Sequence, residues 1–213
     1  MKNNKIKICG IKETSTIECC ANLGVSYIGL LFYKKSPRFV SIDNAISLIN
    51  FSKIKKIIPV GVFVNCKIED IFYIIKKTNL DYIQLHGNED FEYINKIKNE
   101  LNINIIKSIG IKEKKDLQKI NDYSNVDYYL FDYKPEIGEL PGGNAKSFNW
   151  SLLENIKFDK QWFISGGINI NNIQEIHKKI IPYGIDISSG VEAKLGIKSS
   201  KKIIELMEKL NEN

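Results

Sequence analysis

The stretch KIKICGIK, residues 5–12, has isoleucine at alternate positions and then runs into a cysteine followed by a glycine. Such alternation predicts a β-strand over residues 5–9. A doubly wound sheet typically has a glycine-rich fingerprint after its first strand, with an acidic residue about 20 positions later. Here only Cys9 and Gly10 end the strand. The stretch therefore favours a closed barrel over an open sheet.

Outward from this stretch, short apolar segments alternate with longer amphipathic ones. The further predicted strands are residues 26–32, 57–64, 81–85, 103–109, 127–131, 161–165 and 183–187. The predicted helices are residues 15–23, 42–53, 67–78, 89–100, 112–121, 150–156, 171–180 and 198–210. Strict alternation predicts a parallel sheet with right-handed crossovers. We therefore expect an α/β fold in which residues 1–213 form one (β/α)8 barrel domain, with Thr14, Ser41 and Asn88 capping three helices.

Composition limits the possible functions. The chain is 43% hydrophobic and 26% charged, and it contains no apolar run of about 20 residues that would span a membrane. The N-terminus lacks the pattern of a signal peptide, so a cytoplasmic protein with no membrane partner is expected. Four cysteines without a CxxC pair, and only two histidines, argue against a zinc site or a disulfide framework. We expect neither metal nor cofactor.

The net charge of +6 suits either a nucleic acid or a small anionic substrate. The lysines are spread along the chain among Ile, Asn and Glu, as on solvated helix faces, and no nucleic-acid-binding signature accompanies them. A small-molecule partner is therefore expected rather than a nucleic acid. The sequence leaves open whether the protein is a monomer or a homodimer.

Two glycine-rich segments follow the seventh and eighth predicted strands, where a barrel carries its chemistry. Their backbone amides are not covered by side chains, and their serines add hydroxyl donors. Simple turns are the alternative. The pattern predicts a phosphate site formed by Gly166, Gly167, Ser188, Ser189 and Gly190.

Arg38 is the only arginine in a chain with 31 lysines and arginines. Lysine lacks the planar, two-pronged donor that matches a carboxylate or a phosphate. Arg38 is therefore predicted to recognise one of these groups, with a surface charge or a salt bridge as the alternative.

Cys9 and Asp132 are predicted to face each other across the barrel, because the first and sixth strands are not neighbours. A weak acid and a weak base on opposite sides of a substrate form a pair suited to isomerisation. The alternatives are a buried, inert Cys9 and an Asp132 that caps a helix or pairs with Lys134. His86, at the end of the fourth strand, is a candidate pocket residue.

Taken together, these motifs resemble the phosphoribosylanthranilate isomerase family from one end of the chain to the other. The matching segments, in order, are KICGIK, GLLFYKKSPRFVS, VGVFVN, IQLHGNED, LFDYK with PGG and FNW, FISGGIN, GIDISSGVE and GIKSSKKI. The resemblance implies a (β/α)8 barrel that converts N-(5-phosphoribosyl)anthranilate to 1-(2-carboxyphenylamino)-1-deoxyribulose 5-phosphate without a cofactor, in tryptophan biosynthesis.

The resemblance also implies a role for each candidate. Asp132 would be the general acid, and Cys9, at least partly ionised with help from nearby positive charge, the general base. Arg38 would bind the anthranilate carboxylate, while His86 and Asp186 would line the pocket. The phosphate would be held by the residues that follow the last two strands: Gly166, Gly167, Ser188, Ser189 and Gly190.

The loop after the sixth strand departs from the family pattern. Ala145 stands where a glycine is usual and Asn149 where an aspartate is usual. Because alanine disfavours positive φ, the closing conformation of this loop is in question.

Four other functions remain open. A sugar-phosphate isomerase of histidine biosynthesis uses two aspartates, which Cys9 argues against, and a metal-dependent pentose-phosphate epimerase needs more histidines. An inactive anion-binding barrel and a nucleic-acid-binding protein are the other two.

Overall fold

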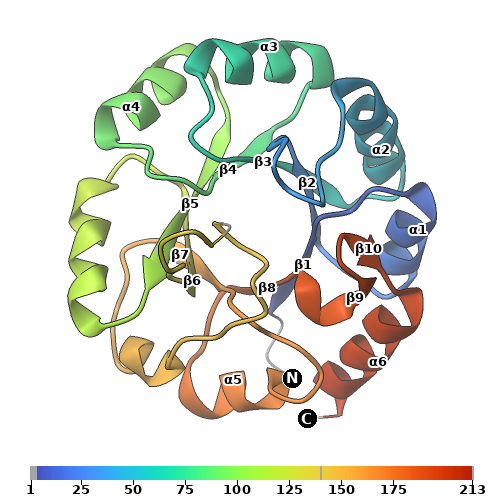
Figure 1. Ribbon diagram of the computed structural model, residues 1–213, viewed down its shortest axis with the longest axis vertical. Helices are drawn as coiled ribbons and strands as arrows, with labels where there is room; N and C mark the ends of the chain where they lie inside the picture. Colours follow the sequence, from blue (N-terminus) through green and yellow to red (C-terminus); the bar gives the residue numbers. More distant parts are fainter. Residues whose placement is uncertain (1–3, 140, 213) are drawn as a thin grey trace.

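The computed structural model describes residues 4–139 and 141–212, and its centre is a closed barrel of parallel strands arranged in chain order (Figure 1). The barrel strands are β1 (Lys5–Cys9), β2 (Tyr27–Leu31), β3 (Ile58–Phe63), β4 (Tyr82–Leu85), β5 (Asn104–Ile111), β6 (Tyr128–Tyr133), β7 (Gln161–Ile164) and β8 (Gly184–Ile187). Pairing of β1 with β8 closes the barrel. The predicted (β/α)8 fold is confirmed, and each predicted strand overlaps an observed one.

Helices surround the barrel on its outside (Figure 1). The α-helices are α1 (Thr14–Asn22), α2 (Ile42–Ile54), α3 (Ile68–Thr78), α4 (Phe91–Glu100), α5 (Ile173–Lys179) and α6 (Ser200–Asn211). Three 3-10 helices are η1 (Lys114–Asp122), η2 (Trp150–Leu153) and η3 (Ser189–Val191). The helices predicted over residues 112–121 and 150–156 are present as the 3-10 helices η1 and η2 rather than as α-helices. An α-helix depends on packing of an apolar face, and η1 is a largely polar segment, KKDLQKIND.

One of the three predicted helix caps is confirmed. The Ser41 hydroxyl accepts a hydrogen bond from the Asn44 amide at 3.3 Å. The other two predictions were wrong. Thr14 is itself the first residue of α1, and α4 is capped by Asp90, whose carboxylate accepts the Tyr93 N–H at 2.8 Å. The Asn88 amide instead donates to the Asn65 side chain, which ties together the loops after β3 and β4.

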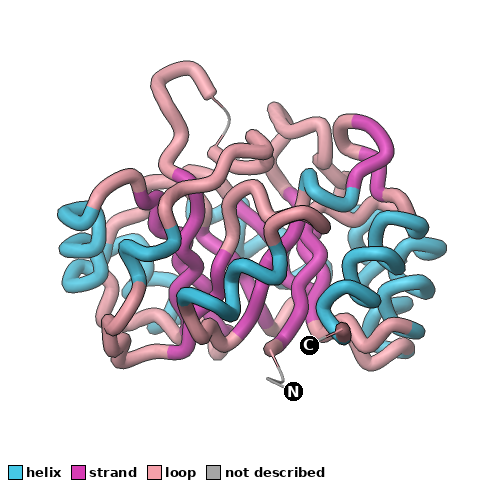
Figure 2. The backbone as a smooth tube through the Cα atoms, turned by 90° about the horizontal axis from the view of Figure 1, so that it is seen from below, coloured by secondary structure: helices cyan, strands magenta, loops and turns pink. Residues whose placement is uncertain are grey.

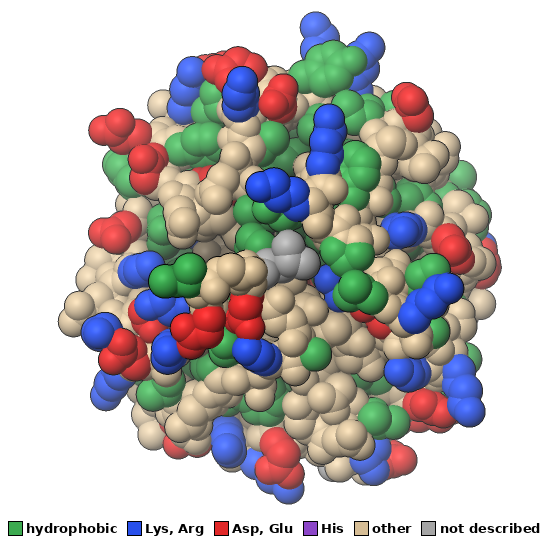
Figure 3. Space-filling view, viewed as in Figure 1, with side chains coloured by type: hydrophobic (Ala, Val, Ile, Leu, Met, Phe, Trp, Pro, Cys, Tyr) green, Lys and Arg blue, Asp and Glu red, His purple; other side chains and the backbone are tan. Residues whose placement is uncertain are grey.

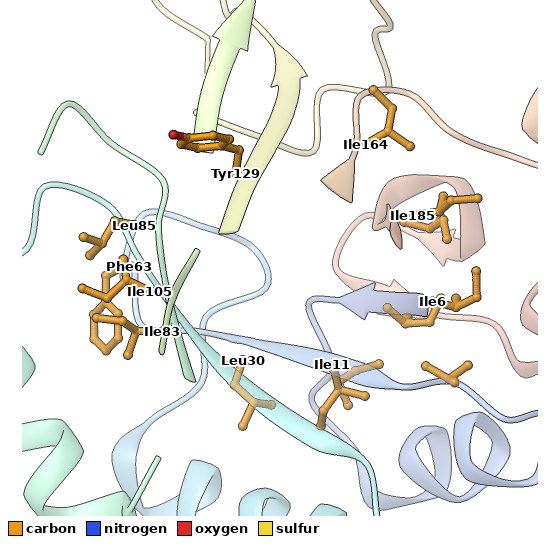
Figure 4. Close-up of a cluster of buried hydrophobic side chains, with 14 of the residues drawn as sticks. Ile6, Ile11, Leu30, Phe63, Ile83, Leu85, Ile105, Tyr129, Ile164 and Ile185 are labelled. Atoms are coloured by element: carbon orange, nitrogen blue, oxygen red, sulfur yellow. The ribbon is translucent and has the colours of Figure 1, made fainter. Parts of the chain in front are cut away.

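The hydrophobic core has two layers. The larger one lies between the strands and the helices, and Figure 4 shows that its members come from strands around the whole barrel, including Ile6, Leu30, Phe63 and Ile185. The smaller one fills the barrel interior, mostly with residues from the first half of the strands: Tyr27, Val60, Ile106, Leu130 and Phe163. This layer occupies the amino-terminal part of the barrel, and a cavity lies at the carboxyl ends of the strands.

One feature at the carboxyl end of the barrel was not among the predicted elements. The strands β9 (Glu192–Lys194) and β10 (Ile197–Lys198) form a short antiparallel hairpin. Figure 2 shows this hairpin and the long loop after β6 on the side of the barrel opposite the chain termini. Strands of two or three residues are too short to produce a periodic sequence signal, so residue 198 was predicted as helix. Among the described residues, every helix is too short or too polar to span a bilayer.

Candidate active site

A cavity at the carboxyl ends of the strands brings together five predicted residues from separate parts of the chain. Its lining includes Cys9 from β1, Arg38 from the loop after β2, His86 after β4, Asp132 from β6 and Asp186 from β8. The rest of the wall has an aliphatic part, formed by Leu31, Val62 and Val64. The loop after β6 contributes Pro141, Gly142 and Gly143. The cavity thus combines an apolar wall with acids, a thiol and a guanidinium.

A second, more polar cavity adjoins the first and shares Asp132, Asp186 and Ser188 with it. It is lined by the two segments predicted to bind phosphate and by the loop after β6, with Gly166, Gly167, Ser188 and Ser189 among its residues. Gly190 does not belong to this lining. A Cβ atom on Gly190 would lie 2.0 Å from the Ile168 carbonyl oxygen, so this glycine allows two backbone segments to pack closely.

Cys9 is the last residue of β1 and is buried beside Lys7, which was not among the predicted site residues. Lys7 precedes it by two residues, on the same face of the strand, and is fully buried. The Lys7 Nζ atom donates to Asp186 Oδ1 at 2.9 Å and also interacts with the Cys9 thiol. A lysine at an inward-facing position of a buried strand is unusual, and this feature of the sequence could have identified Lys7 as a site residue. Lys7, Cys9 and Asp186 form one charged cluster.

The protonation of this cluster reflects a balance between burial and charge. Burial raises the pKa of the Cys9 thiol, while Lys7 and Lys198 act in the opposite direction without cancelling it. Burial likewise raises the pKa of Asp186, against the attraction of Lys7. The expected positive charge is therefore present near Cys9, but burial has the larger effect on the pKa of the thiol and raises it.

Asp132 is held by its backbone and by a histidine. Its Oδ1 atom accepts the Tyr133 N–H at 2.7 Å, and its Oδ2 atom lies 3.3 Å from His86 Nε2. His86 Nε2 is also 3.1 Å from the Pro141 carbonyl oxygen. Since both neighbours of this nitrogen are acceptors, Nε2 carries a hydrogen and donates it. Lys134, the alternative partner for Asp132, instead contacts Asp116 at 2.6 Å.

Arg38 forms a salt bridge, which was the alternative prediction, and it also lines the first cavity. It is buried and forms a two-pronged ion pair with Glu192, through Nε to Oε1 at 2.7 Å and Nη2 to Oε2 at 2.9 Å. It also lines the first cavity, where Nη2 lies 3.5 Å from the Gly143 carbonyl oxygen. Glu192 was missed as a functional candidate because the residues are 154 positions apart in the sequence.

Gly10 makes room for the arginine as well as turning the chain. Its φ angle is +88°, and a Cβ atom there would lie 2.7 Å from Arg38 Cδ. Gly24 also has a positive φ, +74°, but a Cβ atom there would meet nothing within 4 Å. A substitution at either glycine would strain the backbone, but only a substitution at Gly10 would also push against Arg38.

We expect Gly10→Ala to lower the free energy of unfolding by about 1–3 kcal/mol, from backbone strain, and to raise KM because Arg38 is displaced. The matched control Gly24→Ala should lower stability without changing KM. Urea unfolding and steady-state kinetics on both variants provide the measurement. Equal values of KM for the two variants would contradict the role assigned to the Gly10 contact.

The two departures in the loop after β6 have different consequences. Ala145 has a φ of +57°, so it takes the left-handed conformation that a glycine would adopt more easily. Asn149 caps η2, with its side chain accepting the Ser151 N–H at 3.1 Å. Asparagine and aspartate are about equally good caps, so the second departure preserves its local function.

Charges of both signs mix over the face that is seen down the barrel. Figure 3 shows lysines and acidic residues interspersed around this face, without a continuous basic stripe. Within residues 4–139 and 141–212, no three or more His, Cys, Asp or Glu side chains are grouped so that they would hold a metal ion.

A family model and curated relatives identify the family to which this chain is similar. The model of the N-(5'-phosphoribosyl)anthranilate isomerase family matches residues 6–209. An N-(5'-phosphoribosyl)anthranilate isomerase from Rhizobium rhizogenes is 37% identical over 212 residues, which is 99% of this chain and 95% of the relative.

Solved structures extend this similarity to the fold. The phosphoribosyl anthranilate isomerase of Thermotoga maritima is 30% identical, with a TM-score of 0.85 and coverage of 98% of each chain. That enzyme has also been solved as monomers of the dimeric protein. A further isomerase structure contains reduced 1-(o-carboxyphenylamino)-1-deoxyribulose 5-phosphate; it is 28% identical, with a TM-score of 0.80 and 98% coverage of both chains.

Proposed function

This chain belongs to the N-(5'-phosphoribosyl)anthranilate isomerase family, and we propose how its residues divide the work of that reaction. The reaction is an isomerisation in tryptophan biosynthesis, an Amadori rearrangement of N-(5-phosphoribosyl)anthranilate to 1-(2-carboxyphenylamino)-1-deoxyribulose 5-phosphate. The observation that carries the assignment of residues is the single cavity lined by Cys9, Arg38, His86, Asp132 and Asp186.

In the first step, Asp132 acts as general acid. It donates its proton to the ribose ring oxygen as the bond from that oxygen to C1 breaks, and the nitrogen lone pair forms a Schiff-base cation with C1. His86 Nε2, 3.3 Å from Asp132 Oδ2, donates a hydrogen bond that stabilises the carboxylate formed in this step. The position of His86 therefore supports Asp132 as the proton donor.

In the second step, Cys9 acts as general base. Its thiolate removes the C2 proton; the C–H electron pair becomes the C1–C2 double bond, and the cationic nitrogen is neutralised. The enolamine then gains a proton at C1 and loses the C2 hydroxyl proton, which gives the aminoketone. Burial raises the pKa of Cys9, whereas Lys7 and the adjacent Schiff-base cation favour its thiolate. The base is thus ionised most readily when the cation is present.

The substrate is a small molecule with an anionic group at each end. Arg38 binds the anthranilate carboxylate beside the aliphatic wall of Leu31, Val62 and Val64. The phosphate lies in the second cavity, where Gly166, Gly167, Ser188 and Ser189 offer backbone amides and hydroxyl groups. Gly190 contributes through the backbone packing that shapes this loop.

Arg38→Lys should raise KM by about 10- to 100-fold with a smaller change in kcat, because one ammonium cannot satisfy Glu192 and a substrate carboxylate in the geometry of the guanidinium. Lys35→Met, an exposed position in the same loop, is the matched control. Steady-state kinetics over a range of substrate concentrations measure both constants. An unchanged KM in Arg38→Lys would remove Arg38 from carboxylate recognition.

The proposed activity is tested by the loss of fluorescence as phosphoribosylanthranilate is consumed, with and without a chelator. We expect the same turnover in both samples. A chain without turnover would refute the function, and loss of activity with chelator would refute the metal-free mechanism. We also propose a monomer or a homodimer, since the Thermotoga maritima relative is described as dimeric and has been solved as monomers.

A further inference from the structure

Two buried charged residues of the β9–β10 hairpin have no assigned step in the proposed reaction, although Lys198 acts to lower the pKa of the Cys9 thiol. Glu192 is buried and pairs with Arg38, and the Lys198 side chain is only 2% exposed. A carboxylate beside the arginine that binds a substrate carboxylate is unexpected, because like charges repel and Glu192 cancels the charge of Arg38. The pairing of Glu192 with Arg38 therefore weakens the attraction of a substrate carboxylate, and a further contact is needed to offset this loss.

Lys198 restores the charge that Glu192 removes. Its Nζ atom donates to Glu192 Oε1 at 2.9 Å and to the Ser188 carbonyl oxygen at 2.9 Å, and it lies 3.3 Å from Ser188 Oγ. Two cations and one anion leave this cluster with a net positive charge. Burial tends to raise the pKa of Glu192, but hydrogen bonds from Arg38 and Lys198 outweigh it and hold that pKa below its usual range. Glu192 therefore remains an anion.

The contacts of Glu192 also fix the orientation of the arginine. Glu192 takes Nε and Nη2, which leaves the edge that carries Nη1 for another acceptor. A Cβ atom on Gly143 would lie 2.3 Å from Nη1, and one on Gly10 would lie 2.7 Å from Cδ. Arg38 is therefore confined between two glycine-containing segments while Glu192 sets the direction of its plane.

The hairpin is itself anchored to the rest of the barrel. Lys202 Nζ, in α6, donates to the Glu192 carbonyl oxygen at 2.6 Å. A Cβ atom on Gly196, in the hairpin turn, would lie 2.5 Å from the Pro37 carbonyl oxygen, next to Arg38 in the chain. A continuous chain of contacts thus runs from Arg38 through Glu192 and Lys198 to Ser188.

We propose that Glu192 and Lys198 are positioning residues that aim the Arg38 guanidinium at the substrate carboxylate and link it to the phosphate loop at Ser188. This inference rests on the function proposed above. According to this proposal, the hairpin is the reason why the enzyme binds ligands with a carboxylate on the aromatic ring more tightly than ligands without one. Glu192 sets the orientation of the guanidinium, and the positive charge of Lys198 offsets the negative charge of Glu192.

The test compares two ligands by calorimetry. One is reduced 1-(o-carboxyphenylamino)-1-deoxyribulose 5-phosphate, and the other is the same molecule without the carboxylate. The ratio of their dissociation constants isolates carboxylate recognition from phosphate binding and from general loss of structure. The variants are Glu192→Gln and Lys198→Met, with Lys198→Arg as the conservative replacement and the exposed Lys194→Met as the matched control.

We expect Glu192→Gln and Lys198→Met each to reduce the preference for the carboxylate ligand by about 10- to 100-fold, with little change for the other ligand. Lys198→Arg should restore most of it, and Lys194→Met should retain all of it. Glu192→Gln is decisive because it makes the cluster more positive. A purely electrostatic role would increase the preference, whereas a positioning role decreases it.

An unchanged or increased preference in Glu192→Gln, or an equal loss for both ligands, would overturn the proposal. If Glu192→Gln does not fold, as judged by its melting temperature, Glu192→Asp tests the same point. It keeps the charge but is one methylene too short to reach both nitrogen atoms of Arg38, so the preference should still fall. Failure of the proposed function would look different, because the wild-type chain would then neither turn over substrate nor bind the carboxylate ligand.

Discussion

Cys9→Ser is expected to lower kcat by about 10²–10⁴-fold while the barrel stays folded. A serine hydroxyl occupies nearly the same space at the end of β1, where Gly29 leaves room for the thiol, but it is a far weaker acid than a thiol. It is therefore hardly ionised even beside Lys7. A Cβ atom on Gly29 would lie 2.6 Å from Cys9 Sγ, so the site is shaped closely around this side chain. The fluorescence assay gives kcat, and the melting temperature reports the fold.

The C2 proton supplies an independent readout for this variant. With substrate deuterated at C2, removal of that atom becomes the slow step in Cys9→Ser, so the isotope effect on kcat should increase relative to the wild type. Cys19→Ser, which changes a half-buried thiol of α1, is the matched control. Turnover near the wild-type value in Cys9→Ser would remove Cys9 from the mechanism and leave it as a packing residue.

Asp132→Asn is expected to lower kcat by a similar factor, about 10²–10⁴-fold, for a different reason. The asparagine oxygen still accepts the Tyr133 N–H, whose distance to Asp132 is 2.7 Å, so the local backbone is retained. The amide has no acidic proton to give to the ribose ring oxygen. Ring opening then becomes the slow step, and it precedes removal of the C2 proton.

The two variants should therefore differ in their isotope effects. In Asp132→Asn the effect of C2 deuteration on kcat should disappear, whereas in Cys9→Ser it should increase. Asp122→Asn, an exposed aspartate at the end of η1, controls for the loss of a carboxylate elsewhere. An isotope effect in Asp132→Asn as large as that in Cys9→Ser would place Asp132 in the second step rather than in the first.

Much of the barrel was predictable because its strands are buried on both faces. Segments such as residues 127–131 are apolar almost throughout, and this composition distinguishes them from the amphipathic helices between them. The prediction failed where local signals were weak. The polar η1 segment forms a 3-10 helix rather than the α-helix expected in a (β/α)8 barrel, and the hairpin strands, two and three residues long, were too short to be recognised.

The sequence predicted those parts of the candidate site that follow from the order of the strands in the barrel. Once Cys9 and Asp132 are placed at the ends of parallel strands, closure of the barrel brings them to the same rim. The supporting partners were not predictable in this way. Lys7 lies next to Asp186 across the point where β1 and β8 close the barrel, and Glu192 reaches Arg38 from a hairpin far along the chain.

The sequence by itself determined the order of strands and helices, the glycine-rich segments after the last two barrel strands and the unusual single arginine. It did so because these features depend on local patterns of apolar, small and charged residues. Only the tertiary structure decided which charges face each other: Lys7 with Asp186, His86 with Asp132, and Arg38 with both Glu192 and the cavity. Burial and ion pairing depend on what surrounds a side chain in space, and in a closed barrel those surroundings come from distant parts of the chain.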